Sequence, residues 1–292
     1  LIKLMQLTDK QKGIGLALFG VLLITPDSLF VRLITVNSWE LIFYRGLIPF
    51  VCLLITLLFF YKKNFIHACY ITGLAGVLNA ILMALGNITF VISLENTNVA
   101  NTLIMLSLAP FMAAIMSSIF LREHPNKRTW ITMTTCFVFI LFIFFDSYEA
   151  KRIYGDLFGL ATAIFIGASA VVIRYAKLVN FLPSLLLAKF FIILIAIFFV
   201  QSFHIEGSDI YFIIIMGIFC VFIPLSFITL APRYIAAHEV ELFFVLETAL
   251  GPFWVWLVIH EQPSINTIIG GVCIVLLIFT HTFLEFKEKK FN

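Results

Sequence analysis

Long apolar runs separated by short polar breaks make up almost the whole of this chain. An α-helix needs about 20 apolar residues to cross the roughly 30 Å hydrocarbon core of a bilayer. On that scale the pattern predicts ten membrane-spanning helices, which we expect at residues 13–34, 39–61, 66–94, 98–121, 129–146, 156–176, 182–203, 210–231, 237–260 and 265–286. The breaks are too short to hold a soluble domain, so we predict an all-α integral membrane protein.

The composition agrees with this prediction. Hydrophobic residues form 62% of the chain and charged residues 12%, whereas a soluble domain has about 45–50% and 25%. Such a chain cannot cover itself with a wettable surface. The five cysteines lie singly within apolar runs, so we predict neither a disulfide framework nor a metal site. No motif indicates a cofactor.

The basic residues orient the predicted helices. If the N-terminus is cytoplasmic, fourteen lysines and arginines fall in inner loops and tails, three in outer loops and two within spans. An excess of basic residues in cytoplasmic loops is the general rule for membrane proteins. We therefore predict a multi-pass protein of the inner (plasma) membrane with cytoplasmic tails at residues 1–12 and 287–292.

The two halves of the chain resemble each other. A shift of 138 positions aligns residues 100–125 with residues 238–263 and brings Glu123 opposite Glu261. Because five spans is an odd number, the halves must cross the membrane in opposite orientations, which is a recurrent arrangement in transporters. The predicted organisation is a five-helix repeat at 13–146, a linker at 147–155 and a second, inverted five-helix repeat at 156–286.

Three stretches resemble a known family. They are "LAPFMAAIMSSIFLREHP" (108–125), "LAPRYIAA" (230–237) and "ETALGPFWVWLVIHEQPS" (247–264). The chain is similar in them to the EamA-type family of the drug/metabolite transporter superfamily. The resemblance implies a ten-helix bundle with a central cavity, lined mainly by the first, third, fourth, sixth, eighth and ninth helices. Members of the family move small metabolites, amino acids or drugs, often outward.

Two positions depart from the family pattern, which has a glycine before the glutamate at the end of a proline-containing helix. Arg122 and His260 occupy these positions here. We therefore expect Glu123 and Glu261 to be helix-end residues rather than transport residues.

Glu247 is the leading candidate for a transport residue. An isolated carboxylate at membrane depth must find a partner, face water or take up a proton. At 100° per residue Phe243, Gly251 and Trp254 share its helix face, and this mixture of groups suits a small-molecule cavity. We predict that Glu247, Phe243 and Trp254 bind substrate. The structural alternative is a carboxylate that is hydrogen-bonded to a neighbouring helix.

Further polar groups lie at membrane depth. Arg45 and Lys189 could pair with an acid, recognise an anionic substrate or extend to the membrane interface. Asp27 coincides with a proline break, so it could bind substrate or support the break. Amides in the third and fourth predicted helices could bridge helices, and we expect one of them to face the cavity: Asn79, Asn87 and Asn101. The predicted binding residues therefore also include Asp27, Arg45, Asn79 and Asn101.

Small residues and prolines indicate where helices pack closely or bend. Gly155, Gly159, Ala163 and Gly167 fall four apart on one helix face and predict tight helix pairing. Prolines within spans leave backbone carbonyls unpaired, permit kinks and tend to accompany cavities. They occur at positions 26, 49, 110, 224 and 252.

Together these patterns predict a secondary transporter that moves a small organic metabolite, amino-acid-like or amphipathic, by alternating access, as an exporter or exchanger. Its energy could come from the substrate gradient or from protons, with Glu247 as the protonatable group. The alternatives are an integral membrane enzyme acting on lipid, which the scattered histidines disfavour, and a non-transporting membrane scaffold. The expected partners are the substrate and the lipid bilayer, and we expect no nucleic-acid partner. The oligomeric state is left open, with a homodimer as one option.

Overall fold

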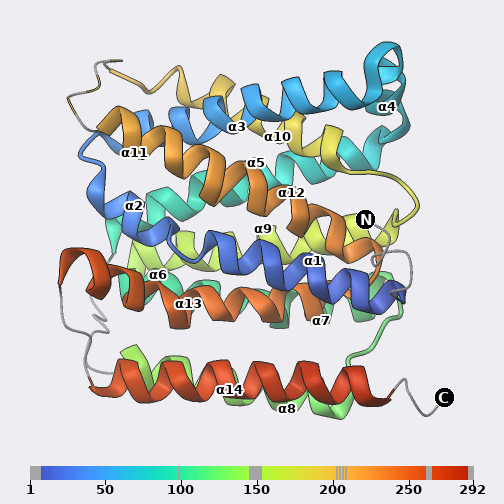
Figure 1. The fold of residues 1–292 in the computed structure, drawn as a ribbon, viewed down its shortest axis with the longest axis vertical. Coiled ribbons are helices and arrows are strands. Elements are labelled where there is room, and N and C mark those ends of the chain that lie inside the picture. Colours follow the sequence, from blue (N-terminus) through green and yellow to red (C-terminus); the bar gives the residue numbers. More distant parts are fainter. Residues whose placement is uncertain are drawn as a thin grey trace.

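The computed structural model describes residues 8–97, 99–144, 153–201, 203, 205, 207, 209–260 and 265–288. Every regular element in these residues is helical, and the helices run side by side along one axis (Figure 1). Seven helical segments are long and apolar enough to cross a membrane, and two shorter helices are also apolar. The predicted class, an all-α membrane protein, is confirmed. Residues 1–7, 147–152 and 289–292 of the predicted tails and linker lie outside the described residues, as does Glu261.

The first half of the chain contains α1 (Asp9–Ile24), α2 (Asp27–Leu33), α3 (Ser38–Tyr61), η2 (Lys62–Asn64), α4 (Phe65–Ile71), α5 (Gly73–Asn96), α6 (Val99–Leu106), α7 (Ala109–Phe120) and α8 (Lys127–Phe144). The second half contains α9 (Ile153–Tyr175), α10 (Leu182–Ala196), α11 (Asp209–Ile215), the π-helix η4 (Met216–Phe222), α12 (Ile223–Leu230), η5 (Ala231–Arg233), α13 (Ala237–Ile259) and α14 (Ile265–Glu288).

Several of the predicted proline positions coincide with breaks in the helices. Pro26 separates α1 from α2, and Pro110 lies in the first turn of α7, directly after the break from α6. Pro224 is the second residue of α12, which follows the π-helix η4 directly. Proline lacks the N–H that would continue the hydrogen-bond ladder, so it is tolerated where a new helix begins. Pro49 lies inside α3, which continues through it.

Two predicted spans differ from the structure. The span at 66–94 is divided into α4 and α5 at Gly73, whose φ of 56° suits a residue without a Cβ. The span at 182–203 contains only the 15 residues of α10. Beyond α10 the chain turns, and Phe199 stacks on Trp39 of α3 with ring centroids 4.3 Å apart. Because aromatic packing outside a helix also buries apolar side chains, the hydrophobic run overestimates the length of this helix.

Small residues bring α9 close to its neighbours. A Cβ added to Gly167 would lie 2.9 Å from the backbone N of Ala113 and 3.1 Å from the backbone O of Ala109, both in α7. A Cβ on Gly155 would lie 2.6 Å from the Cβ of Thr97. Only residues without a side chain allow such close approach of backbones, so the predicted tight pairing along this face is confirmed.

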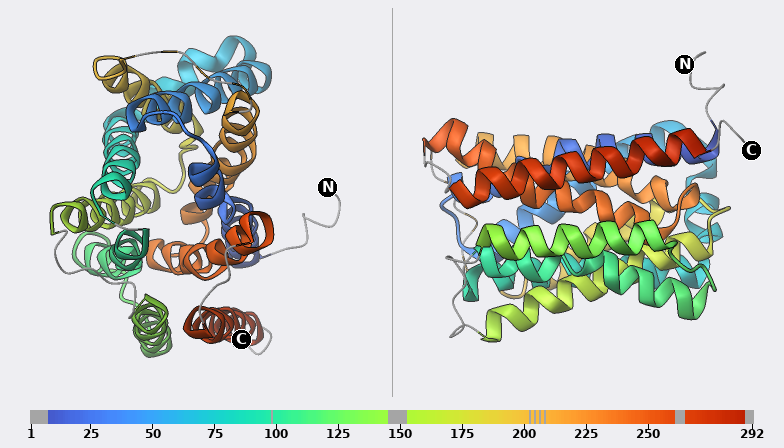
Figure 2. Two further views of the ribbon diagram at one scale, coloured as in Figure 1. Left: turned by 90° about the vertical axis from the view of Figure 1, so that its left-hand side faces the viewer. Right: turned by 90° about the horizontal axis from the view of Figure 1, so that it is seen from below.

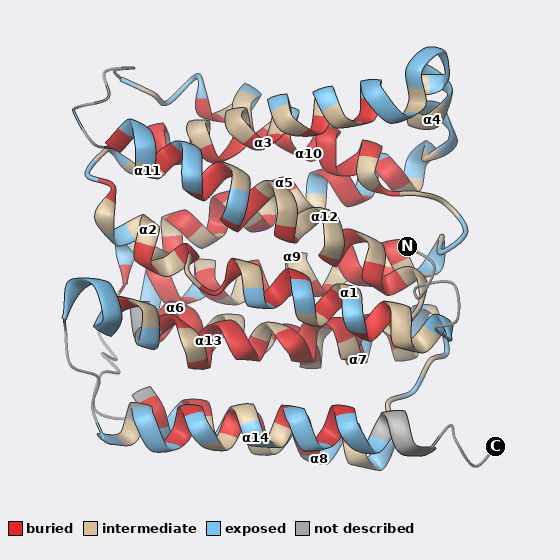
Figure 3. Ribbon diagram, viewed as in Figure 1, coloured by how far each residue is buried: buried red, intermediate tan, exposed pale blue. Residues whose placement is uncertain are grey.

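The helices differ in how they contribute to the bundle. α8 packs against α14, and this pair flanks the other helices (Figures 1 and 2). Buried residues concentrate on the inward faces of the remaining helices, whereas exposed residues lie on outward faces and at the ends (Figure 3). Many exposed residues are large and apolar, such as Phe59 and Phe60 of α3. An outer surface of this kind suits contact with lipid.

Candidate functional site

A cavity lies between the two halves of the chain, with a volume of about 970 Å³ when the open space at its mouth is included. The first half contributes lining residues from α1, α2, α3, α5 and α6, and the second half from α9, α10, η4, α12, η5 and α13. These elements include the six helices that the family resemblance implied, with α3 and α10 in addition. None of the lining residues comes from the described parts of α8 or α14. The site is therefore shared by the two halves.

A buried ion pair between Asp27 and Arg45 forms part of the cavity wall. The break at Pro26 makes Asp27 the first residue of α2, and α3 brings Arg45 to it. Arg45 Nη1 donates to Asp27 Oδ1 at 2.8 Å, and Nη2 donates to Oδ2 at 2.9 Å. This bidentate geometry is the strongest form of a charge-assisted hydrogen bond. Arg45 Nη1 also lies 3.4 Å from Sδ of Met216 in the π-helix.

Three further acidic or basic residues line the cavity: Lys189, Glu241 and Glu247. Lys189 is in the middle of α10 and 2% exposed, and Glu247 is near the middle of α13 and 7% exposed. Both are close enough to Asp27 and Arg45 for their charges to interact. Glu241 lies nearer the start of α13 and is 2% exposed. Within the described part of the chain, none of the three makes a hydrogen bond or ion pair.

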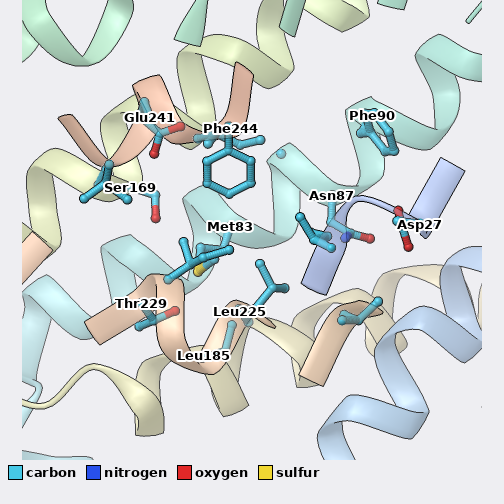
Figure 4. A pocket seen from close by; sticks show the side chains of 18 of the residues that line it. Asp27, Met83, Asn87, Phe90, Ser169, Leu185, Leu225, Thr229, Glu241 and Phe244 are labelled. Atoms are coloured by element: carbon cyan, nitrogen blue, oxygen red, sulfur yellow. The ribbon is translucent and has the colours of Figure 1, made fainter. Parts of the chain in front are cut away.

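The polar groups divide between two ends of the cavity. Figure 4 shows Asp27 and Asn87 toward one end and Glu241 and Ser169 toward the other, with Phe244 between them. We call the first group the Asp27 end; it consists of Asp27, Arg45, Asn87, Lys189 and Glu247. The second group is the Glu241 end; it consists of Ser169, Thr229 and Glu241.

Four of these lining residues have buried polar atoms without a hydrogen-bond partner. The atoms are Arg45 Nε, Asn87 Oδ1, Thr229 Oγ1 and Glu241 Oε2. Buried polar groups in proteins are nearly always hydrogen-bonded. Groups that remain unpaired around a cavity are therefore candidates to contact a bound molecule or water. Asn87 is also the one cavity-lining residue among the three amides considered from the sequence.

The other two predicted amides link helices instead. Asn79 Nδ2 donates to Ser184 Oγ at 2.9 Å, and its Oδ1 accepts from Ser169 Oγ at 2.7 Å, which ties α5 to α10 and α9. Asn101 Nδ2 donates to Asp156 Oδ1 at 2.8 Å, which ties α6 to α9. Neither amide lines the cavity, so neither belongs to the candidate site.

The two predicted aromatic residues also lie outside the cavity lining. Trp254 Nε1 donates to Thr25 Oγ1 at 2.9 Å, beside the break between α1 and α2. Phe243 is buried in the largest apolar cluster of the bundle. The face of α13 that lines the cavity is rotated from the predicted one and includes Glu241, Phe244 and Glu247. The signal that could have identified this face is a second carboxylate in the same apolar run, with an aromatic residue midway between the two.

An ion pair joins three elements beside the cavity. Arg174 Nε donates to both carboxylate oxygens of Glu123 at 3.0 Å, and Nη1 donates to the carbonyl of Pro232 at 3.4 Å. These contacts connect the ends of α7, α9 and η5, and Pro232 itself lines the cavity. Glu123 is thus a helix-end residue, as predicted. Among the described residues, no three His, Cys, Asp or Glu side chains come close enough to hold a metal ion.

Comparison with sequence models of protein families identifies the family of this chain. The sequence model of the EamA-like transporter family matches residues 11–145 and 153–282, which together cover most of the chain. The chain belongs to the EamA-like transporter family. Each matched stretch is one EamA repeat, so the resemblance seen in the sequence is confirmed. Proteins of the EamA-like family are multi-pass membrane transporters of small molecules.

Solved structures share this EamA-like fold, and 29 chains match it. One of them, described only as "Crystal structure of protein", has a TM-score of 0.77 and covers 93% of this chain and 98% of its own. The two sequences are 15% identical, so the likeness concerns the fold alone. No curated protein matches this EamA-like sequence.

Proposed function

We propose that this EamA-like protein is a secondary carrier that moves a small organic metabolite across the cytoplasmic membrane by alternating access, as an exporter or exchanger. The observation that carries the proposal is the charged cavity between the two halves. A mostly apolar cavity with a few convergent polar groups suits a small molecule. Ionisable residues that face a cavity at membrane depth usually belong to a transport pathway.

The proposal includes ten spans in two oppositely oriented repeats. Seven long apolar segments and two shorter ones, in α10 and α14, account for nine crossings. α8, which packs against α14, provides the tenth. α1 begins and α14 ends at the same end of the bundle, which fits an even number of crossings (Figure 1). α4, which follows Lys62 and Lys63, and the start of α8, with Lys127 and Arg128, lie at that end too. Because basic residues favour the cytoplasmic side, we assign this end to the cytoplasm.

The proposed substrate-binding residues are those of the Asp27 end, with Glu247 as their centre. Asn87 and Lys189 stand in place of four residues that the sequence suggested, namely Asn79, Asn101, Phe243 and Trp254. Glu247 makes no hydrogen bond or ion pair with the described residues, so it can bind either a cationic group of a substrate or a proton. This property supports a carrier whose cycle includes protons.

Counterflow in liposomes tests the proposal. Purified protein should equilibrate a labelled solute from a metabolite panel without altering it chemically, which an enzyme acting on lipid would not do. Glu247→Gln should slow exchange by about tenfold, equivalent to about 1.4 kcal/mol of lost interaction. Glu239→Gln is the matched control, because Glu239 lies in the same helix but pairs with Lys10 away from the cavity. Normal exchange by Glu247→Gln would remove this residue from the mechanism, and the absence of exchange of any solute would refute the carrier.

A further inference from the structure

Acidic side chains outnumber basic side chains around the cavity. The charged lining residues are three carboxylates and two cations, namely Asp27, Glu241, Glu247, Arg45 and Lys189. The ionised set therefore has one more negative than positive charge. A net charge buried at membrane depth is costly unless a counter-charge accompanies it. The cavity is thus suited to a molecule that carries one net positive charge.

The Asp27 end offers partners for both halves of an amino acid head group. Lys189 makes no hydrogen bond or ion pair with described residues, and Arg45 Nε is an unpaired donor, so both can serve a carboxylate. Asn87 Oδ1 is a buried acceptor without a hydrogen-bond partner, and Glu247 makes no hydrogen bond with the described residues, so both can serve an ammonium group. Donors and acceptors are therefore present together at this end.

The Glu241 end offers acceptors for a second cation. Glu241 Oε2 and Thr229 Oγ1 are both buried and unpaired. An ammonium group has three donors and no acceptor, so a carboxylate and a hydroxyl that line the same cavity can both accept from it. Phe244 lies between the two ends and can cover an aliphatic chain (Figure 4).

The spacing of the two carboxylates on α13 sets the length of the ligand. Glu247 lies six positions after Glu241, which corresponds to about 9 Å along the helix axis. A span of this order suits a ligand whose two cationic groups are joined by a short aliphatic chain such as the flexible four-carbon stem of lysine.

We infer that the substrate is a cationic amino acid, with its carboxylate at Lys189 and Arg45, its α-ammonium at Glu247, and its distal cation at Glu241. This inference rests on the proposed carrier function and specifies the substrate class of the same site. Such a substrate brings the charge of the loaded cavity to zero and gives every unpaired group at the two ends a partner.

Counterflow with four labelled solutes tests the inference. L-lysine and L-ornithine have both head group and distal ammonium, L-norleucine lacks the distal ammonium, and cadaverine lacks the carboxylate. In wild-type proteoliposomes lysine and ornithine should exchange at least about tenfold faster than norleucine or cadaverine, since each missing group leaves a buried charge unpaired.

Two variants test which end of the cavity recognises each group of the substrate. Glu241→Gln should reduce the ratio of lysine to norleucine exchange by about tenfold, and Lys189→Met should reduce the ratio of lysine to cadaverine exchange. Each readout is a ratio of initial rates within one preparation, so it does not depend on how much of the variant protein is folded. Glu239→Gln, on the same helix but outside the cavity, should keep both ratios.

Three results would overturn the inference while the carrier function stands: norleucine exchanging as fast as lysine, cadaverine exchanging as fast as lysine, or a Glu241→Gln protein with an unchanged ratio. If no solute of the wider metabolite panel exchanges at all, the carrier proposal itself fails. The two failures are therefore distinguishable in the same preparation.

Discussion

At the scale of single residues, the ion pair between Asp27 and Arg45 is the strongest polar contact in the cavity wall. Both side chains are almost completely buried, and two hydrogen bonds of 2.8 and 2.9 Å join them. The desolvation of two charges offsets much of their attraction, but removal of one partner leaves the other charge buried alone. The pair should therefore behave as a unit under mutation.

We expect Asp27→Asn to destabilise the protein by about 3–5 kcal/mol, because Arg45 then lacks its counter-charge. The double variant Asp27→Asn with Arg45→Met should be closer to the wild type than the single variant. The apparent melting temperature of the purified protein in detergent measures both. If the double variant loses as much stability as Asp27→Asn and Arg45→Met lose separately when their losses are added, the two residues do not act as a coupled pair.

The sequence indicated part of this site. Asp27, Arg45, Asn87, Lys189 and Glu247 could all be picked out because ionised and amide groups are rare in apolar runs. Their pairing could not be predicted, since Asp27 and Arg45 meet only through the packing of two separate spans. Glu241 was missed because a helical wheel gives the residues that share a face but not the direction in which that face points.

At the scale of elements, the small residues of α9 determine how closely it approaches α7. The two nearest atoms that a Cβ on Gly167 would meet are backbone atoms, which cannot move aside as a flexible side chain can. The stripe was predictable from spacing alone, because four-residue periodicity places its members on one face. The helices that pack against the stripe were not predictable, because the spacing of small residues does not show which neighbouring helix they contact.

Gly167→Leu should lower the apparent melting temperature and the yield of folded protein, because α7 and α9 must separate to make room for the side chain. Gly15→Leu in α1 is the matched control, since no atom lies within 4 Å of a Cβ at that position. Thermal unfolding of both variants in detergent checks the prediction. Equal stability of the two variants would show that the close approach of α9 to α7 does not matter.

Helix boundaries were less predictable than helix positions. Hydrophobic runs located the membrane-crossing segments, but they could not show that η4 would take a π-helical form before Pro224. A π-helix changes the direction of the side chains on either side of it and is frequent at functional sites. Here it presents Cys220 and Val221 to the cavity.

At the scale of the whole molecule, alternating access requires that contacts at one end of the bundle can open. The ion pair of Arg174 with Glu123, together with the carbonyl of Pro232, joins α7, α9 and η5 at the end that we assign to the cytoplasm. Both side chains are partly exposed. Partly exposed ion pairs are weak enough to break during a transport cycle.

Labelling of Cys220, which lines the cavity, reports this opening. In a protein whose other cysteines are replaced by alanine, a membrane-impermeant thiol reagent on the cytoplasmic side should label Cys220 up to about fivefold faster in Glu123→Gln than in the parent, since the ion pair contributes up to about 1 kcal/mol. Asp9→Asn, which breaks an ion pair with Lys12 inside α1, should have no effect. Equal rates in all three proteins would exclude this ion pair as part of a gate.

The excess carboxylate of the cavity also determines how the electrical potential of the cell acts on transport. Moving one elementary charge across 100 mV corresponds to about 2.3 kcal/mol. A vacant site in which Glu247 has not taken up a proton has one negative charge and is driven toward the outer face when the interior is negative, whereas a site occupied by a monocation is neutral and insensitive. Net movement of a cationic amino acid through the unprotonated site would therefore run inward. Export of such a solute would proceed by swapping it for another cation, a reaction that displaces no net charge.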